Sequence, residues 1–241
     1  MKRFLFSLIF ALLAIGRLCA LDTLYLKDNL KKANKGDFIV TAQNKTYSLL
    51  HMYAKTNRTL TIEEISIPST KVKLNNFSWR DWVRRGAPSN TSWVIYTIDL
   101  DTAEMKDFFS VTKNSWCNVS SQDNILSTLL NLRLEYVPLQ QRKRVGLGNL
   151  SSKNDKRPIW QPRMVVDGQA IDGVPFDAWK TIWPKDGSEL SGKTIEVFVP
   201  EVNSDYPSYF PYWLQISGLV GKAKIRIIDS GTGMVSSVAR P

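Results

Sequence analysis

The amino-acid sequence predicts a mainly β protein with a minor α component, in which sandwich-like antiparallel sheets accompany two short helices in the middle third. Segments rich in β-branched and aromatic residues recur in the first and last thirds, and polar turns separate them. Helical spacing of apolar residues is confined to two short segments between them. About 220 residues follow a predicted leader, which is enough to bury a core without disulfide bonds.

Residues 1–20 are predicted to be a secretory signal peptide. A basic start precedes an apolar run over residues 4–15, and Ala20 supplies the small residue before a cleavage site. The alternative is a lipoprotein signal with Cys19 acylated, although Arg17 is unusual so close before such a cysteine. We therefore expect an exported protein, periplasmic or in the outer envelope of a bacterium and secreted from any other source. No transmembrane span is expected after cleavage.

The mature chain is predicted to be basic. The whole sequence has 32 Lys and Arg against 22 Asp and Glu, and loss of the three basic residues in 1–20 leaves 29 against 22, or +7. Such a charge favours anionic surfaces. Arg142, Lys143 and Arg144 could contact an anionic envelope surface, although a solvated loop is the commoner explanation of adjacent basic residues. We expect no nucleic-acid partner.

Residues 21–137 are predicted to form an N-terminal β-rich domain with two helices. Strands are expected at 38–42, 46–54 and 59–67, where β-branched and aromatic residues concentrate between polar turns. In the third of these strands the apolar residues change phase across two adjacent glutamates. We interpret this change as a β-bulge at the glutamates.

Two helices are expected in the middle third. Ser78 is a candidate N-cap with Asp81 three residues later, and Gly86 is a candidate stop signal. Residues 123–134 have apolar side chains at helical spacing and form the stronger prediction.

The rest of the chain is predicted to be a connection followed by a second β unit. Residues 138–161 are basic and polar, which indicates a linker or long loop. Residues 162–241 are expected to form a C-terminal β subdomain. Its last two strands should pair as a hairpin, with Ile225 and Ile227 facing the core and the intervening basic residues facing solvent.

The segment Gly187–Thr194 fits the pattern G-x-x-x-x-G-K-[ST] of a phosphate-binding loop. In that function Lys193 would contact the β- and γ-phosphates and Thr194 would bind Mg²⁺. Such a loop leads into a helix, whereas residues 194–199 alternate as a strand does. A P-loop nucleotide binder is therefore an alternative, and extended backbone at 194–199 is the expectation.

Other catalytic patterns are weak. The single histidine, His51, lies inside an expected strand, and Cys117 is the one cysteine left after cleavage. A His/Cys zinc site cannot be assembled from one of each, so no metal or cofactor is expected. A pair of carboxylates for glycoside cleavage is compatible with the composition but cannot be located. A cell-envelope hydrolase with unidentified carboxylates is thus an alternative function, and we favour a protein that is not an enzyme.

The aromatic residues suggest a binding surface. Buried rings are the ordinary role of aromatic side chains. Trp179 and Trp183 nevertheless lie in a polar segment, and Tyr209 and Phe210 lie in a proline-containing loop. Trp213 falls on the second face of the strand that follows this loop, opposite its core face. We predict that these five side chains form an aromatic platform for a ligand.

The segment FDAWKTIWPKDGSELSGKTIEVFVPEVNSDYPSYFPYWLQISG, followed by KAKIRIIDSG, resembles an uncharacterised exported-protein family of chlamydia-like bacteria. The resemblance covers about the last third of the chain and implies a bacterial envelope address. It carries over no activity and no site residues. Our first hypothesis is an exported, non-enzymatic envelope protein that binds a protein partner or a glycan through the aromatic platform.

Overall fold

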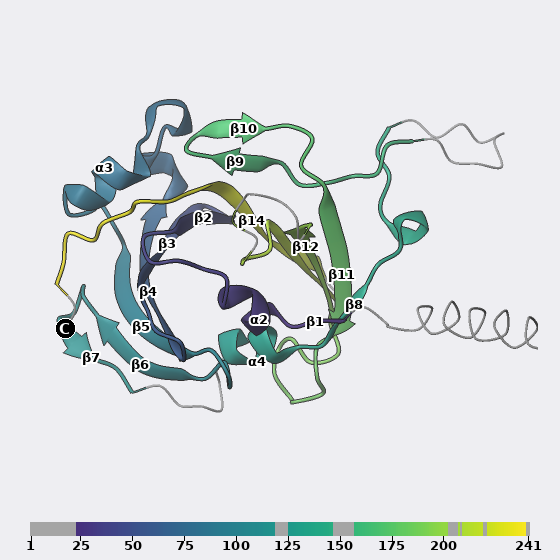
Figure 1. Ribbon diagram of the computed structural model, residues 1–241, viewed down its shortest axis with the longest axis horizontal. Helices are drawn as coiled ribbons and strands as arrows, with labels where there is room; N and C mark the ends of the chain where they lie inside the picture. The colour runs from purple at the N-terminus through teal and green to yellow at the C-terminus, as the bar shows by residue number, and fades with distance from the viewer. Residues whose placement is uncertain are drawn as a thin grey trace, which may run out of the picture.

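A computed structural model describes residues 23–118, 125–146, 157–201, 207, 209–218 and 221–239, and within them strands greatly outnumber helices (Figure 1). The strands are β1 (Thr23–Leu24), β2 (Phe38–Gln43), β3 (Thr46–Lys55), β4 (Thr59–Pro68), β5 (Ser92–Asp99), β6 (Met105–Ser110), β7 (Ser115–Trp116), β8 (Leu134–Tyr136), β9 (Met164–Val166), β10 (Gln169–Ile171), β11 (Phe176–Ile182), β12 (Thr194–Pro200), β13 (Trp213–Gly218) and β14 (Gly221–Gly231). The helices are α2 (Leu26–Leu30), α3 (Trp79–Arg84) and α4 (Ile125–Asn131), with 3₁₀ turns η1 (Ser69–Lys71), η2 (Leu74–Asn76) and η3 (Leu139–Gln141).

Within these described ranges, twelve strands form one antiparallel sheet in the order β1-β8-β11-β12-β13-β14-β2-β3-β4-β5-β6-β7, and β9 and β10 form a separate hairpin. The sheet curves so strongly that the arm containing β4 and β5 faces the arm containing β11 and β12 across α2 (Figure 1). The predicted mainly β, sandwich-like class is therefore confirmed. Both helices of the middle third are also confirmed, and α2 is a third.

The inner side of the curved sheet encloses the larger hydrophobic cluster. Leu26 and Leu30 of α2 are buried there together with Leu60 and Ile62 of β4 from one arm and Val197 of β12 from the other. Helix α4 lies beside α2 near the gap between the two ends of the sheet (Figure 1). The two short helices therefore fill the space that the curvature creates, and burial of their apolar side chains stabilises the curve.

The outer side carries a second hydrophobic cluster beneath α3. Trp79, Trp82 and Val83 of this helix pack against Val40 of β2 and Ile65 of β4. The helix begins as predicted, since the Ser78 hydroxyl accepts a hydrogen bond from the Asp81 N–H. It ends just before Gly86, whose φ of 77° is easily reached only by glycine.

The phase change in β4 has a different cause from the one predicted. Strand β4 pairs with β5 without interruption, and the register shift lies on β3, between Met52 and Ala54. Leu60 belongs to the inner cluster, whereas Ile65 and Ile67 belong to the outer one. The strand is regular, and its buried face changes because different elements cover its two halves.

The C-terminal strands agree with their sequence patterns. β13 and β14 form the expected hairpin, in which Ile227 is buried while Lys224 and Arg226 are exposed. Residues 194–200 are the strand β12.

Strands from both predicted β units share the large sheet, because β8 pairs with β11 and β14 pairs with β2. The proposed boundaries at residues 137 and 162 remain predictions. The leader, with Cys19, lies outside the described residues. No helix within the described ranges is long and apolar enough to span a bilayer.

A buried carboxylate joins the outer side of the sheet to the C-terminal segment. Glu63 is fully buried, and its Oε2 lies 2.8 Å from Nδ1 of His51. Its Oε1 accepts hydrogen bonds from the Trp93 indole N–H at 2.9 Å and the Ser236 hydroxyl at 2.6 Å. Because a buried carboxylate is costly without donors, each of these partners stabilises the fold.

Replacing Trp93 by Phe removes one of these donors, and we expect the free energy of unfolding to fall by about 1–3 kcal/mol. Trp116→Phe is the matched control because that side chain is 60% exposed, and its effect should stay within about 0.5 kcal/mol. Urea unfolding of both variants measures the difference. Equal effects would contradict the structural role given to the Glu63 contacts.

Candidate functional site

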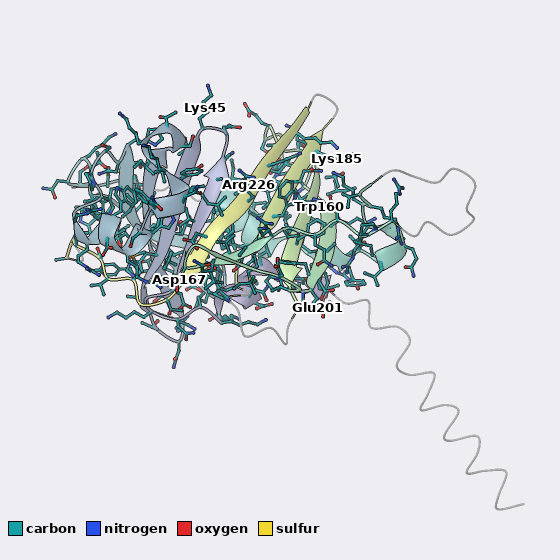
Figure 2. The ribbon with its side chains drawn as sticks, turned by 90° about the horizontal axis from the view of Figure 1, so that it is seen from above. Lys45, Trp160, Asp167, Lys185, Glu201 and Arg226 are labelled. Atoms are coloured by element: carbon teal, nitrogen blue, oxygen red, sulfur yellow. The ribbon has the colours of Figure 1, made fainter. Side chains whose placement is uncertain are left out.

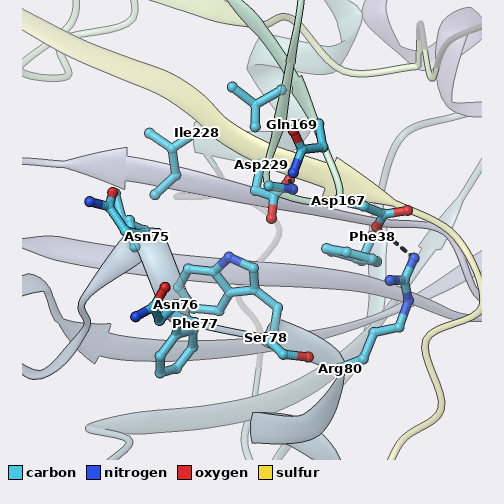
Figure 3. Close-up of a pocket in the computed structure, with 14 residues that line it drawn as sticks. Phe38, Asn75, Asn76, Phe77, Ser78, Arg80, Asp167, Gln169, Ile228 and Asp229 are labelled. Carbon is cyan, nitrogen blue, oxygen red and sulfur yellow. Dashed lines mark hydrogen bonds and ion pairs between the residues drawn. The ribbon is translucent and has the colours of Figure 1, made fainter.

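A cavity of about 440 Å³ lies on the outer side of the sheet, and we call it the α3–hairpin cavity. Its walls are η2 with the start of α3 on one side and the β9–β10 hairpin on the other, and β14 and Phe38 of β2 contribute to its floor (Figure 3). Four segments far apart in the sequence therefore meet here.

The hairpin turn brings polar groups to the cavity. Asp167 and Gly168 are its two central residues, with φ values of 51° and 75°. Two left-handed residues in succession are typical of a type I′ turn, for which Asp-Gly is a preferred sequence. The carboxylate of Asp167 forms an ion pair with Arg80 of α3 at 2.6 Å. The hairpin is thereby tied to the helix across the cavity.

Asp229 is the buried carboxyl group of the site. It is only 6% exposed, and its Oδ1 accepts hydrogen bonds from the N–H groups of Gly168 at 3.0 Å and Ser230 at 2.9 Å. Burial raises the pKa of Asp229 above its ordinary value of 3.8; these two N–H groups and Arg80 oppose the rise, and the charge of Asp167 adds to it. Figure 3 shows the carboxyl group directed into the cavity. Its second oxygen has no hydrogen-bond partner among the described residues.

The opposite wall is aromatic. Trp79 is 3% exposed and contacts Phe77 edge to face, with ring centroids 4.7 Å apart. Within the described part of the chain the indole N–H of Trp79 has no acceptor, although the residue lines the cavity. The exposed side chains of Asn75 and Asn76 add amide groups at the rim. The cavity therefore offers the half-buried Phe77 ring, a free donor and a free acceptor to a ligand with several hydroxyl groups.

A second hollow, which we call the β14 groove, has a volume of about 450 Å³ and a basic lining. Lys222, Lys224 and Arg226 line it from alternate positions of one strand, together with Trp213 of β13. The Lys224 Nζ lies 5.5 Å from the centre of the Trp213 ring. Trp160 packs against Trp213 at 4.8 Å, and Figure 2 labels Trp160 and Arg226 in this region.

The five side chains of the predicted aromatic platform are not gathered on one surface. Trp183 is buried and donates to Asp186 at 2.8 Å, and Tyr209 is buried in the inner cluster. Trp179 packs on Tyr136. The remaining two are half-buried: Phe210 packs against the inner cluster, and Trp213 lines the β14 groove. The loop-like sequence around these residues did not reveal that tertiary packing covers most of the rings.

The three adjacent basic residues also have different environments. Arg142 is buried, and its guanidinium donates to the carbonyls of Val137 and Phe176 and pairs with Asp177. It is therefore not available to an envelope surface. Lys143 is exposed, with its Nζ 5.6 Å from the centre of the Trp160 ring. Arg144 is half-buried and donates to the Arg157 carbonyl.

The glycine-rich segment Gly187–Thr194 connects β11 to β12. The N–H of Gly192 donates to the Trp183 carbonyl, so this amide is not directed at a ligand. Thr194 begins a strand rather than a helix, as expected. The helix N-terminus that a phosphate-binding loop requires is therefore absent here.

Sequence reasoning missed the residues of the α3–hairpin cavity as a group. Ser78 was identified as a helix cap, and the Asp-Gly turn carries a hairpin signal. No local pattern indicates that the hairpin, α3 and the end of β14 converge. The described residues contain no group of three or more His, Cys, Asp or Glu side chains placed to hold a metal ion.

The fold and these hollows define a mainly β protein that presents its candidate ligand sites on the outer side of a curved antiparallel sheet. The model of the CT021 protein family matches residues 48–172, slightly more than half of the chain, so the protein belongs to that family. The predicted resemblance is thereby confirmed, although the matched range precedes the segment on which it was based.

A solved structure supports the fold. The hypothetical protein CT021 from Chlamydia trachomatis is 18% identical, with a TM-score of 0.63 over 91% of this chain and 98% of that chain. LprF from Mycobacterium bovis is 13% identical, covering 89% of this chain and 96% of that chain, but its TM-score of 0.32 is too low to carry an argument. No curated protein sequence matches the chain.

Gly231 must lack a side chain because the ion pair at the cavity lies against it. A Cβ there would overlap Oδ1 of Asp167 and approach Phe38 Cε1 to 2.7 Å. We expect Gly231→Ala to lower the free energy of unfolding by about 1–3 kcal/mol. Gly218→Ala is the control, since its Cβ would meet only the flexible Lys193 side chain. Thermal unfolding of both variants compares them, and an unaffected G231A would contradict the close packing described.

The raised pKa of Asp229 predicts a pH-dependent stability. The folded state holds the proton of the Asp229 carboxyl group more tightly than the unfolded state does. The stabilisation that this proton gives the folded state is therefore present at low pH and is lost as pH rises through the raised pKa. Asp229→Asn keeps an oxygen for both backbone donors and does not titrate. In chemical denaturation, the stability of the wild type relative to D229N should therefore fall as the pH rises above about 4, the ordinary pKa of an aspartate. If the stability of the wild type relative to D229N stayed constant or rose with pH, the raised pKa of Asp229 would be refuted.

Proposed function

We propose that this CT021-family protein is an exported, non-enzymatic envelope protein, periplasmic or at the outer envelope, that binds a glycan in the α3–hairpin cavity. One observation carries the proposal: the free indole N–H of Trp79 and the free carboxyl oxygen of Asp229 belong to the same aromatic-lined cavity. The leader sequence supports the exported address.

The cavity has the size and chemistry that a sugar needs. Its volume of about 440 Å³ falls within the ordinary range for small-molecule sites. The face of a sugar ring is apolar and can pack on the half-buried Phe77 ring, while its hydroxyl groups donate to Asp229 and accept from Trp79. A ligand whose hydroxyl groups pair with both would be selected over one that leaves either group unpaired in the complex.

A hydrolase is the second candidate because the cavity holds two carboxyl groups in different environments. Asp229 is buried with a raised pKa, and Asp167 is exposed beside Arg80. Such a difference is typical of the acid and the ionised partner in glycoside cleavage. We favour binding because Asp167 is engaged by Arg80 and Asp229 by two backbone N–H groups, so both hold the hairpin in place.

The test compares two matched variants by calorimetric titration with neutral disaccharides, N,N′-diacetylchitobiose and cellobiose. Trp79→Phe removes the free donor and should weaken binding about tenfold, the loss expected for one hydrogen bond of about 1.4 kcal/mol. Trp82→Phe removes the same atoms from a ring whose N–H donates to the Pro88 carbonyl. This control should lose about 1 kcal/mol more stability than W79F and keep the wild-type affinity.

Absence of binding to every disaccharide, or equal affinity of W79F and wild type, would contradict the proposal. Release of reducing sugar from the same disaccharides by the wild type, abolished in D229N, would replace binding by hydrolysis as the function.

A further inference from the structure

The α3–hairpin cavity and the β14 groove adjoin each other. Tyr47 lines the groove and Trp79 lines the cavity, and their rings are in edge contact with centroids 6.2 Å apart. On β14, Arg226 lines the groove and Ile228 lines the cavity. Two residues along a strand span about 7 Å. One small molecule can therefore occupy the α3–hairpin cavity and the β14 groove at the same time.

The β14 groove is cationic, and its positive charges are not paired with carboxylates among the described residues. Lys222, Lys224 and Arg226 are exposed, and among the described residues no carboxylate lies within ion-pair distance of any of them. Three like charges at alternate positions of one strand repel each other in the absence of an anion. A guanidinium next to an ammonium group is well suited to a phosphate group.

The charges are segregated along the surface. The cavity has the carboxyl groups of Asp167 and Asp229 and one cation, Arg80, which is paired with Asp167, whereas three cations and no carboxyl group line the groove. A phosphate is therefore attracted to the groove more strongly than to the cavity, and an uncharged sugar ring fits the cavity. The two ends of the surface therefore select one orientation of a ligand that carries both groups.

We infer that the ligand is a phosphorylated glycan, with its sugar ring in the α3–hairpin cavity and its phosphate bound by Arg226 and Lys224 in the β14 groove. This inference rests on the proposed function and adds the chemical class of the ligand. The shared chemistry is a phosphate ester on a hexose, supplied either by a free sugar phosphate or by the phosphorylated sugar headgroup of an envelope lipid.

The experiment titrates the protein with N-acetylglucosamine, N-acetylglucosamine 6-phosphate and inorganic phosphate at low salt. The sugar phosphate should bind at least about tenfold more tightly than the sugar, because a hydrogen bond to a charged group is stronger than a neutral one. The double variant with Arg226→Gln and Lys224→Gln should lose this gain in affinity for the sugar phosphate, while its affinity for the uncharged sugar stays unchanged. The control is the double variant with Lys35→Gln and Lys185→Gln, which loses the same amount of charge outside the groove. It should still bind the sugar phosphate more tightly than the sugar.

The outcomes separate the two proposals. If the uncharged sugar binds but its phosphate ester binds no more tightly, the phosphorylated class is wrong and glycan binding stands. If inorganic phosphate binds as tightly as the sugar phosphate, the groove is an independent anion site and the joined site is overturned. If neither sugar binds, the proposed function itself fails.

A second arm identifies the source of the phosphate ester. Phosphatidylcholine vesicles with monophosphoryl lipid A are compared with vesicles of equal charge that contain phosphatidylglycerol. Binding to the first alone, lost in the R226Q/K224Q variant, supports a lipid headgroup; binding to neither, with the soluble ester bound, supports a free sugar phosphate. Equal binding to both vesicles would show general attraction to anionic membranes and would overturn the inference.

Discussion

The structure depends on the burial of apolar side chains on both faces of one strongly curved sheet. Along β4, Leu60 and Ile62 contribute to the inner cluster, and Ile65 and Ile67 contribute to the outer one. The inner face is filled by α2 and α4, while the outer face is covered by α3 and by the hairpin β9–β10 (Figure 1). The outer elements cover the sheet incompletely, and the α3–hairpin cavity occupies the space between them.

The residues that hold this cavity open also give it its chemistry. Arg80 and Asp167 connect α3 to the hairpin, and Asp229 connects the hairpin to β14. The hairpin can approach this closely because Gly231 has no side chain. A buried carboxyl group, a free indole donor and an ion pair are therefore consequences of how the covering elements are attached to the sheet.

The family relationship supports the fold, while the functional proposal rests on the site. The structural likeness to CT021 of Chlamydia trachomatis spans nearly all of that chain at low sequence identity. Similar folds host different functions, so the fold alone assigns none. The arguments for a glycan and its phosphate come from the free hydrogen-bonding groups of Trp79 and Asp229 and from the unpaired cations of β14.

Local patterns in the sequence were sufficient for the class of fold and for most of its elements. The capping residues of α3, the alternation in β12 and the hairpin β13–β14 each depend on neighbours along the chain, and each was predicted. Side chains in a strand alternate between its two faces, but this alternation does not predict which face another element will cover. For that reason the phase change in β4 was misassigned to a bulge.

The same limit applied to the functional residues. Trp183 and Tyr209 lie in polar or proline-containing segments, and only long-range packing places them in the interior. Conversely, nothing near Asp167 in the sequence indicates that Arg80 and Asp229 will lie beside it. The sequence by itself determined the net charge, the helices α3 and α4, and strands such as β2, β3, β4 and β12, because these follow from local chemistry. Tertiary structure alone decided which aromatic rings are covered and which polar groups meet in one cavity, because those outcomes depend on how distant segments pack against a shared sheet.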